Sequence, residues 1–173
     1  MKHIAQFMKR YIILILSFLT SSCWLMAQPY IIKRLGIEQG LSNNYVVGIT
    51  QDKQGFLWFA TERDGLNAYN YHSQTFTAYQ NDPQNPNSLI TNDVTDIAPA
   101  QDTDGIWICT YYRGIDHLDT ATGKFTHYNK TTVPTLESEQ TWTVLDGGDG
   151  NLYIGHVNSG FSILSLKDRS TIN

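Results

Sequence analysis

Aromatic side chains are the first residues of this 173-residue sequence whose types could do chemistry. Residues 55–71 bring together Phe56, Trp58, Tyr69 and Tyr71. Clustered rings of this kind line many ligand sites, where they offer flat apolar surfaces. A binding site needs its constellation once, whereas a structural repeat needs it in every copy. The interpretation of this stretch therefore depends on whether it recurs.

The stretch recurs twice further along the chain. The second copy follows the first at an offset of 49 residues, and the third follows the second at an offset of 46 (58 to 107, then 107 to 153). The equivalent aromatic residues are Trp58, Trp107 and Tyr153, and the equivalent glycines are Gly65, Gly114 and Gly160. We therefore interpret these six residues as structural, the aromatic ones as packing plates between repeated units and the glycines as turn residues.

Acidic turns and histidines could bind metals, but their spacing argues against it. Asp102 and Asp104, and likewise Asp146 and Asp149, resemble parts of calcium loops. A complete loop also needs a bidentate Glu at its twelfth position, and after Asp102 that position is Arg113. The histidines lack the paired spacing of a zinc site. We predict no metal and no cofactor.

Catalytic residues are not predicted either. The sequence contains no Gly-x-Ser-x-Gly elbow, and no acid recurs in a context resembling a glycosidase pair. Cys109 is interpreted as a small buried filler of the repeat. The chain is therefore not expected to be an enzyme by itself.

Tyr111, Tyr112 and Arg113 are the candidate ligand-binding residues. They occupy the positions of Glu62, Arg63 and Asp64 in the first copy, so the repeat does not require them for packing. Sugar recognition needs exposed rings for stacking and polar groups for hydroxyls. Aromatic residues in a loop that are not repeated are better candidates for function than repeated ones.

The elements that position these residues are short β-rich runs. In the first copy they cover residues 45–50, 56–61, 66–71 and 75–79, separated by turn-forming residues. Four such strands form an antiparallel meander, and no long stretch after residue 27 shows helical periodicity. Four-stranded units recurring every 40 to 50 residues indicate a β-propeller, with a stacked solenoid of hairpins as the rival.

The small residues at the position two after each aromatic plate favour blades. Ala60, Cys109 and Gly155 would let neighbouring sheets approach closely. The predicted fold is thus all-β: a partial β-propeller of about three four-stranded antiparallel blades, with copies at about 41–82, 88–130 and 138–173, not closed within this chain. Residues 30–35 are expected to form an outer strand of a further blade, and the third copy is expected to end before its fourth strand.

The first 27 residues have a different composition. Lys2, Lys9 and Arg10 precede an apolar run, and a small residue, Ala27, ends the segment. This order is typical of a secretory signal peptide, so residues 1–27 are predicted to direct export and residues 28–173 to form the propeller. An uncleaved membrane anchor is one alternative. Lipidation at Cys23 is another, since the residues before it loosely follow the bacterial lipoprotein signal.

The charge of the remaining chain argues against nucleic acid as a partner. All acidic residues lie after residue 27, which leaves nine basic against sixteen acidic side chains, a net charge of −7. No basic stripe interrupts this balance, which repels phosphate backbones.

The repeated text resembles the two-component regulator propeller. The residues that carry the resemblance lie at 40–44, 51–61, 64–67, 76–79 and 87–90, and the third copy departs from the pattern at Tyr153 and His156. The resemblance implies the periplasmic sensor region of hybrid histidine kinases of Bacteroidetes, whose full-length relatives carry propellers, a membrane span and kinase modules. It also implies an oligosaccharide ligand.

The predicted function is accordingly that of an N-terminal fragment of a periplasmic sensing propeller. It would recognise oligosaccharides on the periplasmic side of the inner membrane and signal to a histidine kinase that, with the remaining blades, lies outside this chain. Two alternatives stay open: part of a secreted propeller-fold enzyme that degrades polysaccharides, and a truncated remnant without function.

Overall fold

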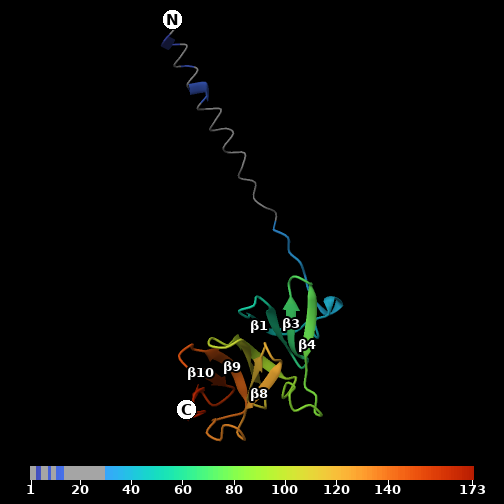
Figure 1. The fold of residues 1–173 in the computed structure, drawn as a ribbon, viewed down its shortest axis with the longest axis vertical. Coiled ribbons are helices and arrows are strands. Elements are labelled where there is room, and N and C mark those ends of the chain that lie inside the picture. The colour runs from blue at the N-terminus through green and yellow to red at the C-terminus, as the bar shows by residue number, and fades with distance from the viewer. Residues whose placement is uncertain (1–2, 5–7, 9–10, 14–29) are drawn as a thin grey trace. The chain divides into compact units, whose positions relative to one another are not determined.

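The computed structural model describes residues 3–4, 8, 11–13 and 30–173 (Figure 1). The chain divides into two units, residues 1–34 and residues 35–173. In the first unit the described residues up to position 13 are helical, and residues 30–34 have no regular structure. No helix among the described residues has the length and apolar character needed to cross a membrane. The signal peptide predicted at 1–27, including Cys23, falls largely outside the described residues.

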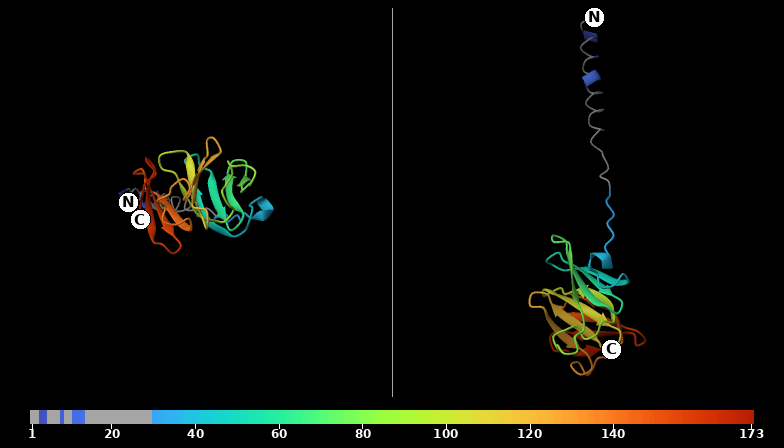
Figure 2. Two further views of the ribbon diagram at one scale, coloured as in Figure 1. Left: turned by 90° about the horizontal axis from the view of Figure 1, so that it is seen from below. Right: turned by 90° about the vertical axis from the view of Figure 1, so that its right-hand side faces the viewer.

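The second unit contains three four-stranded antiparallel sheets, which lie side by side in chain order (Figures 1 and 2). In each sheet the order of the strands along the chain is also their order in space. After a short 3₁₀ helix, η2 (Ile37–Gln39), the strands are β1 (Val46–Gln51), β2 (Leu57–Thr61), β3 (Gly65–Asn70), β4 (Thr75–Tyr79), β5 (Val94–Pro99), β6 (Gly105–Thr110), β7 (Ile115–Asp119), β8 (Lys124–Tyr128), β9 (Thr141–Asp146), β10 (Asn151–His156), β11 (Phe161–Ser165) and β12 (Thr171–Ile172). The predicted all-β fold is confirmed, with three four-stranded blades that do not close into a ring in the part of the chain that the structure describes.

Two details of the prediction were wrong. Residues 30–35 form no strand: Tyr30 is 98% exposed and Ile32 95% exposed, and no strand edge pairs with this segment in the part of the chain that the structure describes. An extended segment becomes a strand only where a neighbouring edge takes its hydrogen bonds. The third blade does have a fourth strand, because β12 pairs with β11 through Ile163 opposite Ile172.

The blades are held together by two apolar clusters, one at each junction. The first cluster joins residues of blade 1 to residues of blade 2: Trp58, Ala60, Leu66, Ala68, Leu89, Val94, Ile97, Ile106, Ile108 and Leu118. The second joins blade 2 to blade 3: Ala98, Ala100, Trp107, Cys109, Ile115, Val133, Leu136, Val144, Leu152, Ile154 and Leu164. Burial of apolar area at about 25 cal/mol per Å² makes these junctions the main source of stability.

The turns between the second and third strands of each blade depend on glycine. Gly65 and Gly114 have φ angles of 77° and 79°, in the left-handed region that other residues avoid. A Cβ atom added at Gly65 would also lie 2.5 Å from the carbonyl oxygen of Tyr79, and one at Gly114 would collide with the carbonyl oxygen of Tyr128. The glycines thus let the fourth strand pass close to the turn.

A bulge interrupts the first strand of every blade at the same place. The register shifts between Val46 and Gly48 in β1, between Val94 and Asp96 in β5, and at the start of β9. The extra residues are Val47, Thr95 and Trp142. A β-bulge bends its strand and re-aims the extra side chain. Because β5 lies beside both β1 and β9, the three re-aimed side chains come to one region of the unit.

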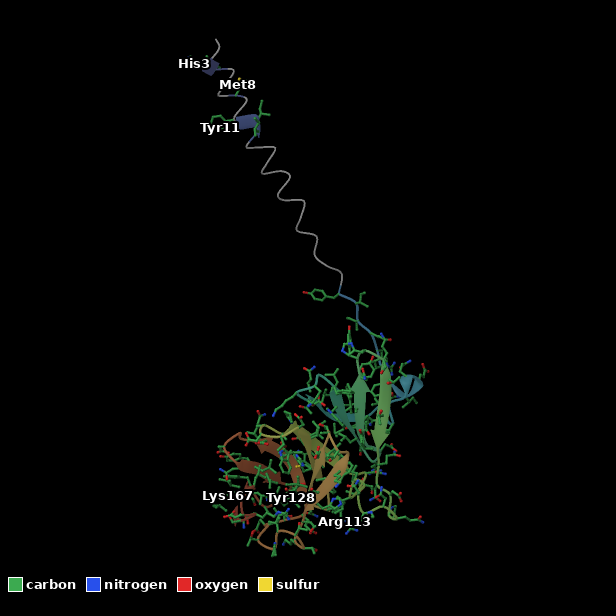
Figure 3. The ribbon with its side chains drawn as sticks, viewed as in Figure 1. His3, Met8, Tyr11, Arg113, Tyr128 and Lys167 are labelled. Atoms are coloured by element: carbon green, nitrogen blue, oxygen red, sulfur yellow. The ribbon has the colours of Figure 1, made fainter. Side chains whose placement is uncertain are left out.

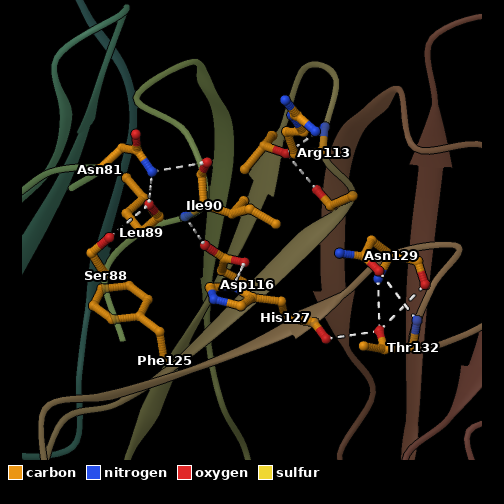
Figure 4. Close-up of polar contacts among 12 residues, drawn as sticks. Asn81, Ser88, Leu89, Ile90, Arg113, Asp116, Phe125, His127, Asn129 and Thr132 are labelled. Carbon is orange, nitrogen blue, oxygen red and sulfur yellow. Dashed lines mark hydrogen bonds and ion pairs between the residues drawn. The ribbon is translucent and has the colours of Figure 1, made fainter. Parts of the chain in front are cut away.

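The second residue after each turn glycine in blades 1 and 2 anchors the loop that enters the same blade. Asn67 accepts a hydrogen bond from the Ser42 backbone N–H (3.1 Å). At the equivalent position Asp116 accepts one from the Ile90 N–H (2.8 Å), and its other carboxylate oxygen lies 2.6 Å from His127 Nδ1 (Figure 4). At this position of the repeat, an amide in blade 1 and a carboxylate in blade 2 therefore accept the equivalent hydrogen bond from the entering loop.

Candidate functional site

A wide hollow opens where the first strands of the blades begin. Its volume is about 1010 Å³. The walls come from the starts of β1, β5 and β9 and from the β2–β3 and β6–β7 turns. The lining residues are Asn44, Tyr45, Val46, Val47, Glu62, Arg63, Asp93, Val94, Thr95, Asp96, Tyr111, Tyr112, Trp142 and Thr143.

The three bulge residues all line this hollow, but only one is aromatic. Val47 and Thr95 are small, and the Thr95 hydroxyl donates to the Thr141 carbonyl oxygen (3.0 Å), tying β5 to β9. Trp142 is 56% exposed, and its surface faces the hollow and the solvent rather than a junction cluster. An exposed tryptophan at a position that elsewhere holds Val or Thr is not needed for packing.

Three aromatic rings form a row along one wall. The Tyr111 and Tyr112 ring centroids lie 4.2 Å apart with an interplanar angle of 81°, and those of Tyr111 and Trp142 lie 6.4 Å apart at 72°. Edge-to-face contacts of this kind are favourable for aromatic rings and hold them rigidly. Trp142 and Tyr112 leave more than half of their surfaces exposed to the hollow and to solvent. We name the residues Tyr111, Tyr112 and Trp142 the aromatic row.

Of the three candidate residues from the sequence, the structure places two in the hollow. Tyr111 and Tyr112 are part of its lining. Arg113, labelled in Figures 3 and 4, is exposed on the same turn but does not belong to the lining; its backbone N–H donates to the Thr110 hydroxyl (3.1 Å). The role of all three in ligand binding stays a prediction.

Sequence reasoning missed Trp142 and Tyr45, the latter 62% exposed at the edge of the hollow. A signal for Trp142 was present. Aligning the first strands of the three copies would have shown Trp142 at the position of Val47 and Thr95, a departure from the repeat like that of Tyr111 and Tyr112. The bulge that turns it into the hollow is not readable from the sequence.

Acidic groups dominate the charge of the hollow. Glu62, Asp93 and Asp96 contribute carboxylates, and Arg63 contributes the guanidinium among the described lining residues. Arg63 lies 4.0 Å from Glu62, with both side chains largely exposed. An exposed pair of this kind interacts weakly.

Asp96 clamps blade 2 to blade 3 at the floor of the hollow. Its Oδ2 accepts hydrogen bonds from the Thr143 hydroxyl (2.6 Å) and the Val144 N–H (3.1 Å). The equivalent residue in blade 1 is Gly48, where an added Cβ atom would meet Ile97 at 3.3 Å and the Asp96 carboxylate at 3.5 Å. A residue without a side chain at position 48 therefore leaves room for the Asp96 clamp.

Tyr112 in the aromatic row has a shifted pKa. The pKa of the Tyr112 phenol is raised above its usual value by reduced solvation, by Tyr111 and by the charge of Asp93. The ring therefore stays neutral at physiological pH, as a stacking surface and hydrogen-bond donor requires.

The repeated aromatic residues lie apart from this hollow. Trp58 and Trp107 are buried in the first and second junction clusters. The Trp58 indole N–H donates to Asp52 of its own blade (2.7 Å), whereas that of Trp107 donates to Asp146 of the next blade (3.0 Å). Tyr153 is half-buried, belongs to neither cluster of the described residues, and donates its hydroxyl to Asp149 (2.9 Å).

Other candidate chemistry does not assemble. The described residues contain no group of three or more His, Cys, Asp or Glu side chains placed to hold a metal ion. In the turn that contains Asp102 and Asp104, the backbone carbonyls of Gln101 and Thr103 accept from Lys53 Nζ at 2.5 and 3.3 Å. Cys109 is fully buried, and this burial raises the pKa of its thiol far above the usual range, so it is not a nucleophile.

Comparisons with known proteins agree with this architecture. Residues 40–63 match the family described as two component regulator propeller. The extracellular domain described as belonging to the putative hybrid two component system BT3049 of B. thetaiotaomicron is 52% identical, with a TM-score of 0.65, over 84% of this chain and 26% of that chain. The extracellular domain of BT4673 from the same organism has a TM-score of 0.65 at 23% identity, over 77% of this chain and 19% of that one, a likeness of fold alone.

A curated protein is also similar to part of this chain. "Histidine kinase P4" of Formosa agariphila is 38% identical over 77 residues, which are 44% of this chain and 5% of that protein. The chain thus spans about a quarter of the first solved structure and a twentieth of this kinase.

Fold and repeat together define an open β-propeller with a ligand-sized hollow at the start of its first strands. Residues 40–63 match the two-component regulator propeller repeat, and the chain is similar to a solved extracellular domain of a putative hybrid two-component system.

Proposed function

We propose that this chain is part of the ligand-sensing propeller of a hybrid two-component sensor and that the sensed ligand is an oligosaccharide. The kinase and the remaining blades would lie in other parts of the full-length sensor. Export by residues 1–27 to the periplasmic side of the inner membrane fits this role, with lipidation at Cys23 as the alternative. The likeness to the extracellular domain of one putative hybrid two-component system supports the proposal.

The observation that carries the ligand part is the aromatic row. Tyr111, Tyr112 and Trp142 are aromatic at positions where other copies of the repeat have none, and they meet in one hollow. Pyranose rings present C–H faces that stack on such surfaces, and their hydroxyls bond to carboxylates like Glu62 at the rim. A hollow of about 1010 Å³ has room for several sugar units.

Thermal unfolding of the purified full chain, with and without a panel of plant, algal and host oligosaccharides at millimolar concentration, tests this proposal. A binder stabilises the folded state by mass action, by about 2.7 kcal/mol at a hundredfold excess over its Kd. We expect at least one oligosaccharide to raise the melting temperature of the chain, and to raise that of its Trp142→Ala variant by about half as much or less. No shift with any member of the panel would contradict the proposal.

A further inference from the structure

The charge around the aromatic row restricts the class of sugar that fits it. Three carboxylates line the hollow, and the Arg63 guanidinium already lies beside one of them, Glu62. Reduced solvation and Tyr111 raise the pKa of the Tyr112 phenol, and the negative charge of Asp93 adds to this rise. A ligand stacked on the row would therefore sit in a negative potential.

The three acidic residues that line the hollow have different roles. Asp96 is occupied, since its two oxygens accept hydrogen bonds from the Ile97 N–H, the Thr143 hydroxyl and the Val144 N–H. Hydrogen bonds of this kind hold the carboxylate in place. Glu62 and Asp93 also line the hollow. Their backbone carbonyl oxygens accept hydrogen bonds from the Asn43 side chain and from the Tyr111 N–H, and the Glu62 carboxylate is in a weak, exposed pair with Arg63.

We propose that this hollow selects uncharged oligosaccharides and rejects those that carry uronate or sulfate groups. The inference rests on the proposed function, since it concerns the ligand of the same site. A carboxylate or sulfate on a sugar stacked against Trp142 would meet Glu62 and Asp93 as like charges, whereas neutral hydroxyls donate hydrogen bonds to the same oxygens. If a ligand charge lay about one Debye length from the two carboxylates, they would weaken its binding several-fold at low salt and less at high salt.

Matched ligands separate charge from shape. Hexamers of galacturonate and of its fully methyl-esterified form have the same rings and linkage but differ in charge, and neutral hexamers of glucose, mannose, xylose and galactose extend the panel. Isothermal titration of the full chain at 20 mM and 200 mM salt measures each affinity. We expect every binder to be uncharged, and the affinity for it to be nearly independent of salt.

Variants of the chain sharpen the test. Trp142→Ala should weaken binding of the neutral ligand about tenfold, since one stacking surface is lost. Tyr71→Ala removes another exposed tyrosine, outside the lining of this hollow, and should leave the affinity unchanged. The double variant Glu62→Gln, Asp93→Asn should raise the affinity for the galacturonate hexamer at least threefold at low salt and abolish its salt dependence.

The outcomes are distinguishable. Binding of galacturonate in preference to its ester would overturn the charge selection but leave an oligosaccharide as the ligand. Binding of neutral and acidic hexamers with equal affinity at 20 mM salt would also overturn it. Failure of every hexamer and of every saccharide in the thermal panel would overturn the proposed function and the inference with it.

Discussion

The Asp116–His127 pair should make the stability of this propeller depend on pH, and replacing Asp116 by Asn should remove that dependence. Asp116 is fully buried, and His127 is 24% exposed. His127 Nδ1 lies 2.6 Å from the carboxylate and Nε2 lies 3.2 Å from the Pro86 carbonyl oxygen (Figure 4). Both ring nitrogens thus face acceptors, so the geometry is satisfied by the doubly protonated imidazolium.

Both pKa shifts act in the same direction. The hydrogen bond to Asp116 raises the pKa of His127, against a smaller opposing effect of burial. Burial raises the pKa of Asp116, although His127 and the Ile90 N–H partly offset this. The folded state therefore holds its protons to higher pH than the unfolded chain, and stability falls as pH rises. For His127 this stabilisation is complete below about pH 6.5 and is lost as pH rises through the raised pKa.

The change in stability with pH is limited because a single proton is involved. One proton changes the free energy of unfolding by at most about 1.4 kcal/mol per pH unit, and the partial exposure of His127 reduces this further. We expect the wild type to lose about 1 kcal/mol more than Asp116→Asn between pH 6 and pH 8. In the variant the amide oxygen can still accept from the Ile90 N–H, as the Asn67 amide oxygen accepts from the Ser42 N–H in blade 1. The NH₂ of the introduced Asn can donate to a neutral His127. Asp116→Ala, which leaves both partners unsatisfied, should cost about 2–3 kcal/mol.

Urea unfolding of the full chain at pH 6, 7 and 8, followed by tryptophan fluorescence, measures these differences. His117 and His156 have pKa values lowered by burial, so they alter the wild-type profile in the opposite sense. The difference between wild type and Asp116→Asn at each pH cancels their contribution. An identical pH dependence in both proteins, or a loss for Asp116→Asn as large as for Asp116→Ala, would refute the reasoning.

Three further predictions concern the repeat. Trp107→Phe removes the indole N–H that donates to a buried carboxylate of the next blade, so it should cost about 2 kcal/mol of stability in urea unfolding. Tyr153→Phe, at the equivalent but half-buried position, should change stability by less than about 0.5 kcal/mol. In Gly114→Ala the new side chain must adopt a positive φ and collides with a backbone carbonyl oxygen, so the variant should lose more than about 3 kcal/mol of stability. Gly160→Ala has a positive φ but meets no atom within 4 Å, so it should lose about 1 kcal/mol. Equal losses of stability in the same assay would contradict this reasoning. Cys109 should react with iodoacetamide only as the chain unfolds, and peptide mass spectrometry that finds it alkylated within minutes in the folded protein would disprove its burial.

The repeat made the fold predictable, because its signals are local. Turn glycines such as Gly65 and the alternating β-rich runs recur in each copy, and the strand bounds of the first blade were predicted to within one residue. The strand expected at 30–35 failed because the sequence shows β propensity but not whether an edge is available beside it. The two-residue strand β12 was missed because its pairing with β11 depends on geometry rather than composition.

The hollow was only partly predictable. Departure from the repeat identified Tyr111 and Tyr112, because packing does not explain an aromatic residue that the other copies lack. Trp142 departs in the same way, but its direction is set by a bulge in β9, and the sequence gives no register. The hydrogen bonds of Asp96 across the blade junction could not be predicted either, since their two donors lie on a strand about 47 residues later.

The most direct test of the account is a crystal structure of the full chain with the tightest-binding neutral oligosaccharide of the panel. We predict a sugar ring stacked on Trp142, with Tyr111 and Tyr112 beside it and its hydroxyls directed to Glu62 or Asp93. A sugar bound elsewhere, with the aromatic row left uncovered, would contradict the claim that residues departing from the repeat form the ligand site.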